Sequence, residues 1–114
     1  MELPAELAHA LTGSGRIATE FTITRLADDR FYLLSGAVAH DRDLDLLRFS
    51  RRDGEAVTVS DVTGDLDILI LAGPRSRDLL AKLTPAELGN SAFPWRTARE
   101  IDVAGISVRA LRLN

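Results

Sequence analysis

Glu20 is the residue whose type and setting best suit it to chemistry. It lies in a stretch of alternating character, residues 17–24, on the same side as Thr22 and opposite Phe21. If that side lines a cavity, the carboxylate can orient a ligand amine or exchange a proton with it. If that side faces solvent, Glu20 is an ordinary surface residue. The pattern alone leaves both interpretations open.

The histidines and the other acids form no metal-ligand pattern. His9 and His40 lie far apart in the sequence, and neither has a partner at ligand spacing. The aspartates at positions 41, 43 and 45 are interpreted as the solvated face of a helix. The sequence has no cysteine, which excludes thiolate metal sites, disulfides and cysteine nucleophiles. We therefore predict no metal in this chain.

Phosphate-binding and hydrolase motifs are also missing from the sequence. The glycines at positions 13 and 15 precede a predicted strand, whereas phosphate-binding loops precede a helix. No nucleophile elbow marks a Ser–His–Asp hydrolase. A Ser–His–Asp constellation stays open without such a motif, and acid–base chemistry at Glu20 is the more interesting candidate.

The composition is that of an ordinary globular domain. Of the 114 residues, 46% are hydrophobic and 27% are charged, which suffices for one domain with a core. The formal charge of −3 and the lack of a basic stripe argue against a nucleic-acid surface. The longest apolar run is too short to span a membrane, and the N-terminus lacks the features of a secretory signal. We expect a cytoplasmic protein that binds neither nucleic acid nor membrane.

Two hairpins are predicted from turn residues flanked by alternating stretches. The first joins residues 17–24 to residues 31–34 and carries Glu20. The second joins residues 101–103 to residues 106–108. Both hairpins favour a mainly antiparallel sheet.

Helices are predicted over four segments. Residues 41–48 carry acids early and arginine late, as the helix dipole prefers. Residues 2–11 have leucines at four-residue spacing. A further helix is expected after Gly73-Pro74, and Thr84-Pro85 begins a short helical turn with the form of a capping box.

The centre of the chain is predicted to be a buried strand. Residues 66–72 form a nearly unbroken apolar run, and residues 57–60 predict another strand before it. This order of elements predicts one α+β domain over residues 1–114: ferredoxin-like split β-α-β units, with a mainly antiparallel sheet and helices packed on one face. Residues 108–113 still have strand character where the sequence ends, so we expect a piece of a longer protein.

Six short runs, spread in order along nearly the whole chain, resemble one family. The family is the folate-binding aminomethyltransferase domain, the glycine-cleavage T-protein fold, which is also found at the C-terminal end of dimethylglycine and sarcosine dehydrogenases. The resemblance implies tetrahydrofolate as cofactor and a small amine as donor of a one-carbon unit. The runs are GRIATEFTITRL from Gly15, RFYLLSG from Arg30, HDRDL from His40, VSDVT from Val59, LAGPRSRDLL from Leu71 and FPWR from Phe93.

The resemblance also assigns candidate site residues. T-proteins usually carry two aspartates where Thr19-Glu20 stands, and the second lies near the folate and the aminomethyl group. Glu20 matches it as the longer acid, as in dimethylglycine dehydrogenases, so the chain looks more like the dehydrogenase-linked branch. T-proteins have a folate-contacting asparagine where Gly36 stands, which argues against the T-protein reaction proper. The resemblance thus implies Glu20 as catalytic residue, and as cofactor contacts Glu20, Thr22, Gly36 and Arg112.

Other parts of the family pattern are not found in this sequence. After the arginine that matches Arg112, the family continues into a turn rich in tyrosine and glycine and a glutamate that grips the pterin, whereas this sequence ends at Asn114. The family's opening segment, its C-terminal barrel and a flavin-binding glycine fingerprint are also not found. We therefore expect the chain alone to be inactive and to bind folate weakly or not at all.

Two alternatives to an enzyme remain open. One is a non-catalytic module of the same fold that binds folate. The other is an interaction domain that forms a homodimer through an unpaired edge strand at residues 109–113.

Overall fold

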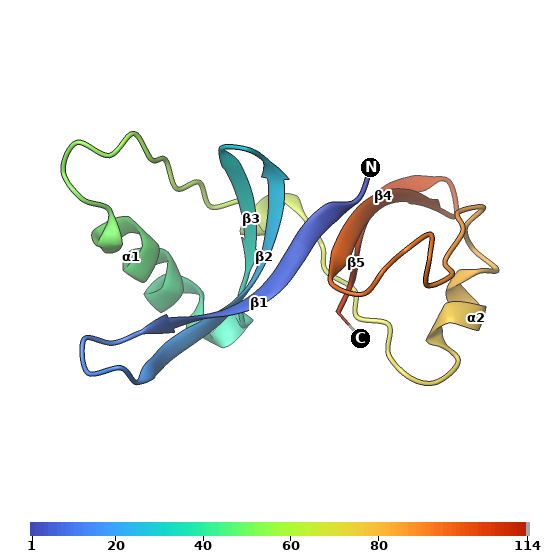
Figure 1. The fold of residues 1–114 in the computed structure, drawn as a ribbon, viewed down its shortest axis with the longest axis horizontal. Helices are drawn as coiled ribbons and strands as arrows, with labels where there is room; N and C mark the ends of the chain where they lie inside the picture. The colour runs from blue at the N-terminus through green and yellow to red at the C-terminus, as the bar shows by residue number, and fades with distance from the viewer. Residues whose placement is uncertain (114) are drawn as a thin grey trace. The chain divides into compact units, whose positions relative to one another are not determined.

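A computed structural model describes residues 1–113, which form two compact units. The first unit contains Met1–Leu34 and the chain from Leu71 onward, and the second contains Ser35–Ile70. Figure 1 shows the elements, which are in chain order β1 (Leu3–Leu11), β2 (Ile17–Ala27), β3 (Arg30–Leu34), η1 (Ala37–Ala39), α1 (His40–Ser50), η2 (Thr63–Asp65), α2 (Ser76–Leu80), β4 (Thr97–Val103) and β5 (Ile106–Arg112).

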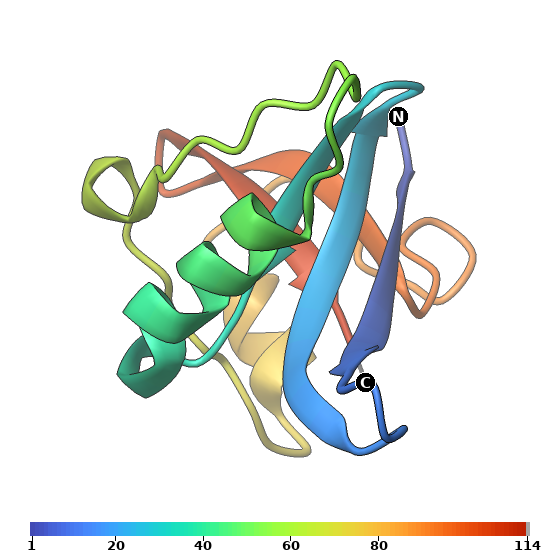
Figure 2. The ribbon, with the colours of Figure 1, turned by 90° about the vertical axis from the view of Figure 1, so that its left-hand side faces the viewer.

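A sheet of five strands is the framework of the first unit. The strand order is β3-β2-β1-β4-β5, and each neighbouring pair is antiparallel. The expected fold class is confirmed, because the chain has an α+β fold with a mainly antiparallel sheet. Figure 2 shows the long strand β2 beside β1, the pair that carries the candidate acid.

Strand β1 corrects the helix predicted over residues 2–11. The leucines at 3, 7 and 11 are four residues apart, and this even spacing also places them on one face of a strand. β1 pairs with β2 from Ala5 to Leu11 and with β4 at Leu3 and Pro4. These long-range pairings decide between two structures that the local spacing leaves equally open.

Both predicted hairpins are confirmed. β2 pairs with β3, and β4 pairs with β5 along the full length of both strands. Ala104 and Gly105 join the second pair with φ values of 53° and 86°, both positive as a type I′ turn requires. The Gly105 N–H donates a hydrogen bond to Asp102 Oδ1 at 2.9 Å, which further stabilises this turn.

A small apolar core covers one face of the β4–β5 hairpin. Leu88, Phe93 and Ile101 are each at most 7% exposed, and Leu80 of α2 packs against them. The segment between α2 and β4 therefore folds back onto the hairpin. The helical turn predicted after Thr84 is wrong, because the Thr84 hydroxyl closes only a local turn by accepting a hydrogen bond from the Ala86 N–H at 3.2 Å.

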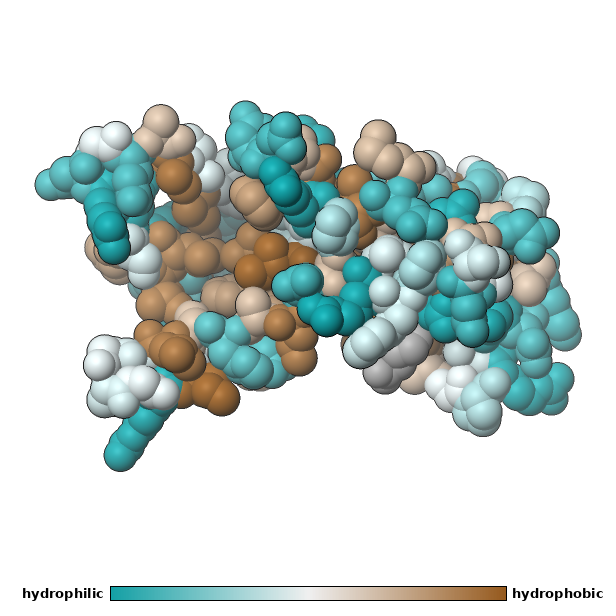
Figure 3. Space-filling view, viewed as in Figure 1, coloured by the Kyte–Doolittle hydropathy of each residue, from teal (hydrophilic) through white to brown (hydrophobic). Residues whose placement is uncertain are grey.

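The second unit holds helix α1 and a long irregular segment. The helix confirms the prediction over residues 41–48. The strands predicted at 57–60 and 66–72 are wrong, since neither segment is a strand in the described structure. An apolar run indicates a preference for burial, but a strand also needs a neighbour that pairs its backbone groups. Leu69 and Ile70 are instead 94% and 90% exposed, and Figure 3 shows apolar residues, in brown, at the surface.

The chain bends after this segment at Gly73. Its φ of 119° lies in the region that side chains rarely adopt, as the sequence led us to expect. The Ser76 N–H donates to the Gly73 carbonyl at 3.1 Å, and α2 follows directly. The helix expected after Gly73-Pro74 is therefore present, but it is only five residues long.

Candidate functional site

Glu20 forms a hydrogen bond with His9 across strands β1 and β2. Its Oε2 lies 2.9 Å from His9 Nε2, because the two residues are directly opposite one another in the register. The side chains of His9 and Glu20 are 42% and 54% exposed, so a ligand in solvent can reach the pair. One carboxylate oxygen is held by the imidazole and the other is open. Such a pair can orient a cationic amine and exchange a proton with it.

Thr22 lies on the same sheet face as Glu20, one residue pair further along β2. It is half-buried between Leu7 of β1 and Leu34 of β3. Thr24, the next residue on this face, is fully buried and its hydroxyl has no hydrogen-bond partner. This face of β2 is therefore exposed to solvent at Glu20 and fully buried at Thr24. The Thr22 hydroxyl lies between the two.

Arg112 anchors a loop and lies on the other face of the sheet. Strand alternation in the register places it opposite the face of Glu20. Its Nη2 donates to Asn90 Oδ1 at 2.8 Å, and its Nη1 donates to the carbonyl of Phe93. Asn90 Oδ1 also accepts a hydrogen bond from Arg77 Nη2 at 3.0 Å. The described structure thus ties this guanidinium to the loop before β4 and does not bring it to Glu20.

Gly36 belongs to the second unit, whereas the other predicted site residues belong to the first. Its φ of −67° and ψ of 133° are extended values that other residues adopt readily. A Cβ at this position would meet no atom within 4 Å. Nothing in the conformation of residue 36 therefore requires glycine, and a Cβ there has open space.

A second histidine–acid cluster lies within the second unit. His40 Nε2 is 2.9 Å from Asp61 Oδ2, and its Nδ1 is 3.0 Å from Asp41 Oδ1. The hydrogen bond with Asp41, followed by the interactions with Asp61, raises the pKa of His40. Hydrogen bonds from Thr63, with a smaller effect of His40, lower the pKa of Asp61 to about 2. The cluster connects the start of α1 to the segment before η2.

Asp43 corrects the prediction of a solvated acidic helix face. Its side chain is almost completely buried, whereas that of the neighbouring Asp41 is exposed. Asp43 Oδ1 accepts hydrogen bonds from Arg42 Nε and Nη2 at 3.2 and 3.1 Å. A buried carboxylate requires such charge compensation, so this aspartate belongs to the packing of the helix.

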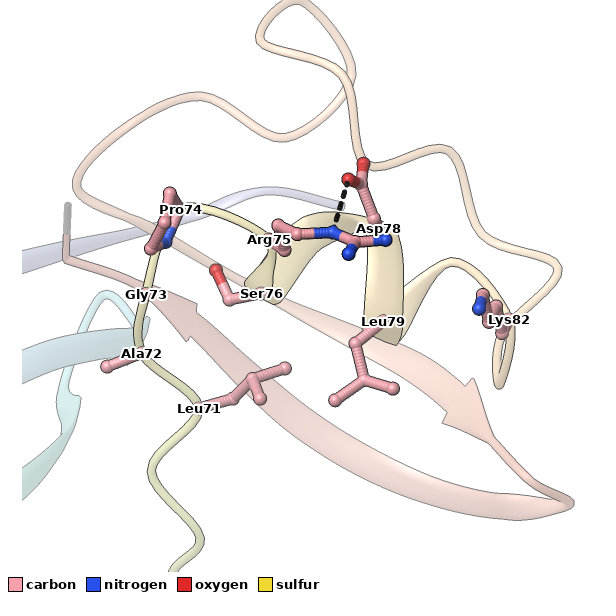
Figure 4. Close-up of a pocket in the computed structure, with 9 residues that line it drawn as sticks. All are labelled: Leu71, Ala72, Gly73, Pro74, Arg75, Ser76, Asp78, Leu79 and Lys82. Carbon is pink, nitrogen blue, oxygen red and sulfur yellow. Dashed lines mark ion pairs between the residues drawn. The ribbon is translucent and has the colours of Figure 1, made fainter.

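The cavity beside α2 has no catalytic constellation. It measures about 440 Å³ and is lined by nine residues between Leu71 and Lys82. Figure 4 shows Leu71 and Leu79 pointing toward one another, while Arg75 and Asp78 form a loose ion pair at 3.9 Å. Across residues 1–113, no three His, Cys, Asp or Glu side chains gather closely enough to hold a metal ion. The helices of the same residues are too short or too polar to cross a membrane.

Sequence reasoning missed His9 as the partner of Glu20. The helix predicted over residues 2–11 would have carried His9 away from the sheet. The alternating order Leu-x-Ala-x-Leu-x-His from Leu3 to His9 was the signal for a strand with this histidine on one face.

Comparisons with known proteins match nearly the whole chain. The model of the GCVT N-terminal domain matches residues 4–114. Human mitochondrial dimethylglycine dehydrogenase is 29% identical over 109 residues, which cover 95% of this chain and 13% of the dehydrogenase. Mouse mitochondrial sarcosine dehydrogenase is 30% identical over 118 residues, with coverages of 91% and 13%. An aminomethyltransferase of Koribacter versatilis is 27% identical over 93 residues, with coverages of 82% and 24%. The chain therefore spans only a small part of the relatives that it matches.

Proposed function

The chain belongs to the GCVT N-terminal domain family, and we propose that it serves the transfer of a one-carbon unit to tetrahydrofolate. The donor is an N-methyl or aminomethyl amine. Dimethylglycine and sarcosine, which appear in the names of two relatives, are N-methylated amino acids, and a third relative is named for aminomethyl transfer. These names support the donor class without identifying the donor.

The observation that carries the proposal is the accessible carboxylate of Glu20 on the open face of β2. His9 holds Oε2 at 2.9 Å and so restricts the rotation of the carboxylate. The open oxygen then accepts a hydrogen bond from the donor amine and orients it. A carboxylate at this position also takes or returns a proton as the amine changes charge.

The residues around Glu20 fit a ligand that carries polar groups on a flat body. The Thr22 hydroxyl lies next along the same face, with the apolar side chains of Leu7 and Leu34 on either side. Tetrahydrofolate, when bound, supplies the nitrogen atoms that accept the one-carbon unit. We assign Glu20 and Thr22 as its contacts on this face, with Gly36 and Arg112 as the further contacts that the family resemblance implies.

A kinetic experiment on the complete gene product that carries residues 1–114 tests the role of Glu20. Glu20→Gln keeps the size of the side chain and removes its charge, so we expect the transfer rate to fall by about 100-fold or more. Glu6→Gln is the matched control. Glu6 is a surface glutamate on the opposite face and pairs with Arg96 at 3.1 Å. Unchanged transfer in Glu20→Gln would remove this residue from the mechanism.

A non-catalytic role in association is the second candidate. Among the residues that the structure describes, strand β5 pairs with β4 alone and is one edge of the sheet, which leaves a row of backbone groups for a second copy of the chain. Light scattering on the purified chain tests this, since a strict monomer at high concentration argues against it. A cytoplasmic location remains a prediction from the sequence.

A further inference from the structure

A second, smaller cavity in the first unit receives side chains from all five strands of the sheet. Its volume is about 240 Å³, below the range of about 300–1,000 Å³ typical of drug-sized sites, so it suits a small ligand. Besides Met1, the lining residues are Leu3 of β1, Leu26 of β2, Arg30 of β3, Glu100 of β4 and Arg109 of β5.

Arg109 is the most firmly positioned polar residue of this cavity. Its guanidinium lies over the ring of Tyr32 at 5.1 Å, and its Nη2 donates to Glu100 Oε1 at 3.1 Å. The side chain is 28% exposed. Its Nε is buried without a hydrogen-bond acceptor, which is unfavourable for a charged donor. The guanidinium is therefore held in one orientation with unused donors.

Arg30 supplies the second cation. It is exposed at the start of β3, and the described residues offer it no acidic partner. Among the side chains that line this cavity, two arginines and one glutamate leave one excess positive charge. The half-buried Leu3 and Leu26 provide an apolar surface beside that charge.

From this arrangement we propose that the cavity binds a small organic carboxylate with an apolar body. The carboxylate lies between the guanidinium groups of Arg109 and Arg30, and the apolar body lies against Leu3 and Leu26. Planar guanidinium groups match carboxylates in geometry and in charge. A dianion is disfavoured because Glu100 already neutralises one of the two cations. This site does not depend on the role proposed for Glu20.

Benzoate is the probe, and the side-chain Nε–H resonances of the arginines in ¹⁵N-labelled chain are the readout. We expect benzoate to shift the Arg109 resonance in a saturable manner. Benzamide has the same shape without the charge, and we expect it to bind about tenfold more weakly or not at all. Inorganic phosphate separates general anion binding from recognition of an apolar carboxylate, and we expect it to bind less tightly than benzoate.

Matched variants locate the site. Arg30→Gln removes one cation at an exposed position, and Arg109→Lys keeps the charge but loses the planar donors, so each weakens benzoate binding by about tenfold. Arg25→Gln is the control, because Arg25 pairs with Asp28 and does not line the cavity. Equal binding of benzoate and benzamide overturns the proposal. So does the absence of a saturable shift, or an equal loss in Arg25→Gln and Arg30→Gln.

Discussion

Arg109 of β5 contacts Tyr32 of β3, although these strands are the opposite edges of the sheet. The guanidinium carbon lies 5.1 Å from the centre of the Tyr32 ring. The two edges of a flat sheet of five strands would be about 19 Å apart, because neighbouring strands are separated by about 4.8 Å. The contact therefore shows that the sheet curls until its edges approach one another on one face. The 240 Å³ cavity is a consequence of that curvature.

Replacing Tyr32 tests whether this contact stabilises the curled sheet. Tyr32→Leu keeps apolar bulk but removes the aromatic face, so we expect a loss of about 0.5–2 kcal/mol in the free energy of unfolding. Urea denaturation measures it. Phe31→Leu is the control, because Phe31 is the neighbouring aromatic residue of β3 and no arginine contacts its ring in the described structure. Equal losses in both variants would show that the arginine contact contributes nothing.

Gly73 allows the bend that precedes α2. Its φ of 119° is strained for any residue with a Cβ, so Gly73→Ala lowers the free energy of unfolding by about 1–3 kcal/mol. Gly13→Ala is the comparison, since residue 13 has a negative φ and open space around it. Chemical denaturation of both variants is the measurement. A Gly73→Ala protein as stable as the Gly13→Ala protein would contradict the backbone strain that we infer for a side chain at residue 73.

The His40 cluster gives the second unit a dependence on pH. A raised pKa means that His40 contributes stability below its ordinary pKa of 6.5 and loses it as the pH rises through the folded value. Asp61, whose pKa is lowered from 3.8 to about 2, contributes stability above pH 3.8 and loses it as the pH falls toward about 2. The cluster therefore stabilises the fold most between the ordinary pKa of Asp61, 3.8, and that of His40, 6.5.

Thermal unfolding of the wild type and of His40→Gln across the pH range measures this effect. We expect the difference in Tm to be largest near pH 5 and to fade in alkaline solution. In a protein that carries Asp61→Asn, adding His40→Gln should change the Tm by less than it does in the wild type. A difference in Tm between wild type and His40→Gln that is constant from acid to alkaline pH would contradict a stabilising role for the charged His40.

The apolar segment before Gly73 provides a test of exposure. Leu69 is 94% exposed, so Leu69→Lys should change the free energy of unfolding by no more than about 0.5 kcal/mol. Leu88→Lys places the same charge in the core, where the residue is only 7% exposed, and should cost several kcal/mol. Urea unfolding compares the two. A large loss in the free energy of unfolding of Leu69→Lys would instead support the buried strand that the sequence predicted.

The hairpins and α1 could be predicted because their signals are local. Ala104-Gly105 specifies its own turn, and the charges of residues 41–48 suit a helix wherever it packs. The structure of β1 could not be predicted in this way, because leucines four residues apart fit a helix and a strand equally well. The run at 66–72 shows the same limit, since apolar character does not supply a pairing partner.

The candidate site was predictable only in part. The alternating stretch and the family resemblance both indicate Glu20, whereas the pair with His9 depends on a register that joins residues eleven positions apart. The cavity at Arg109 was not predictable from local pattern. It requires all five strands to be in place, and its polar residues come from β3 and from the β4–β5 hairpin, which lies far from β3 in the sequence.

The most direct test of the central claim is a titration of the ¹⁵N-labelled chain with tetrahydrofolate, followed through backbone amide shifts. We expect weak, saturable binding, with a Kd on the order of 1 mM, and shifts concentrated around Glu20 and Thr22 on β2. Glu20→Gln should weaken the binding, whereas Glu6→Gln should leave it unchanged. Shifts confined to other strands, or binding that is equally tight in Glu20→Gln and the wild type, would contradict the claim that this face of β2 receives the cofactor.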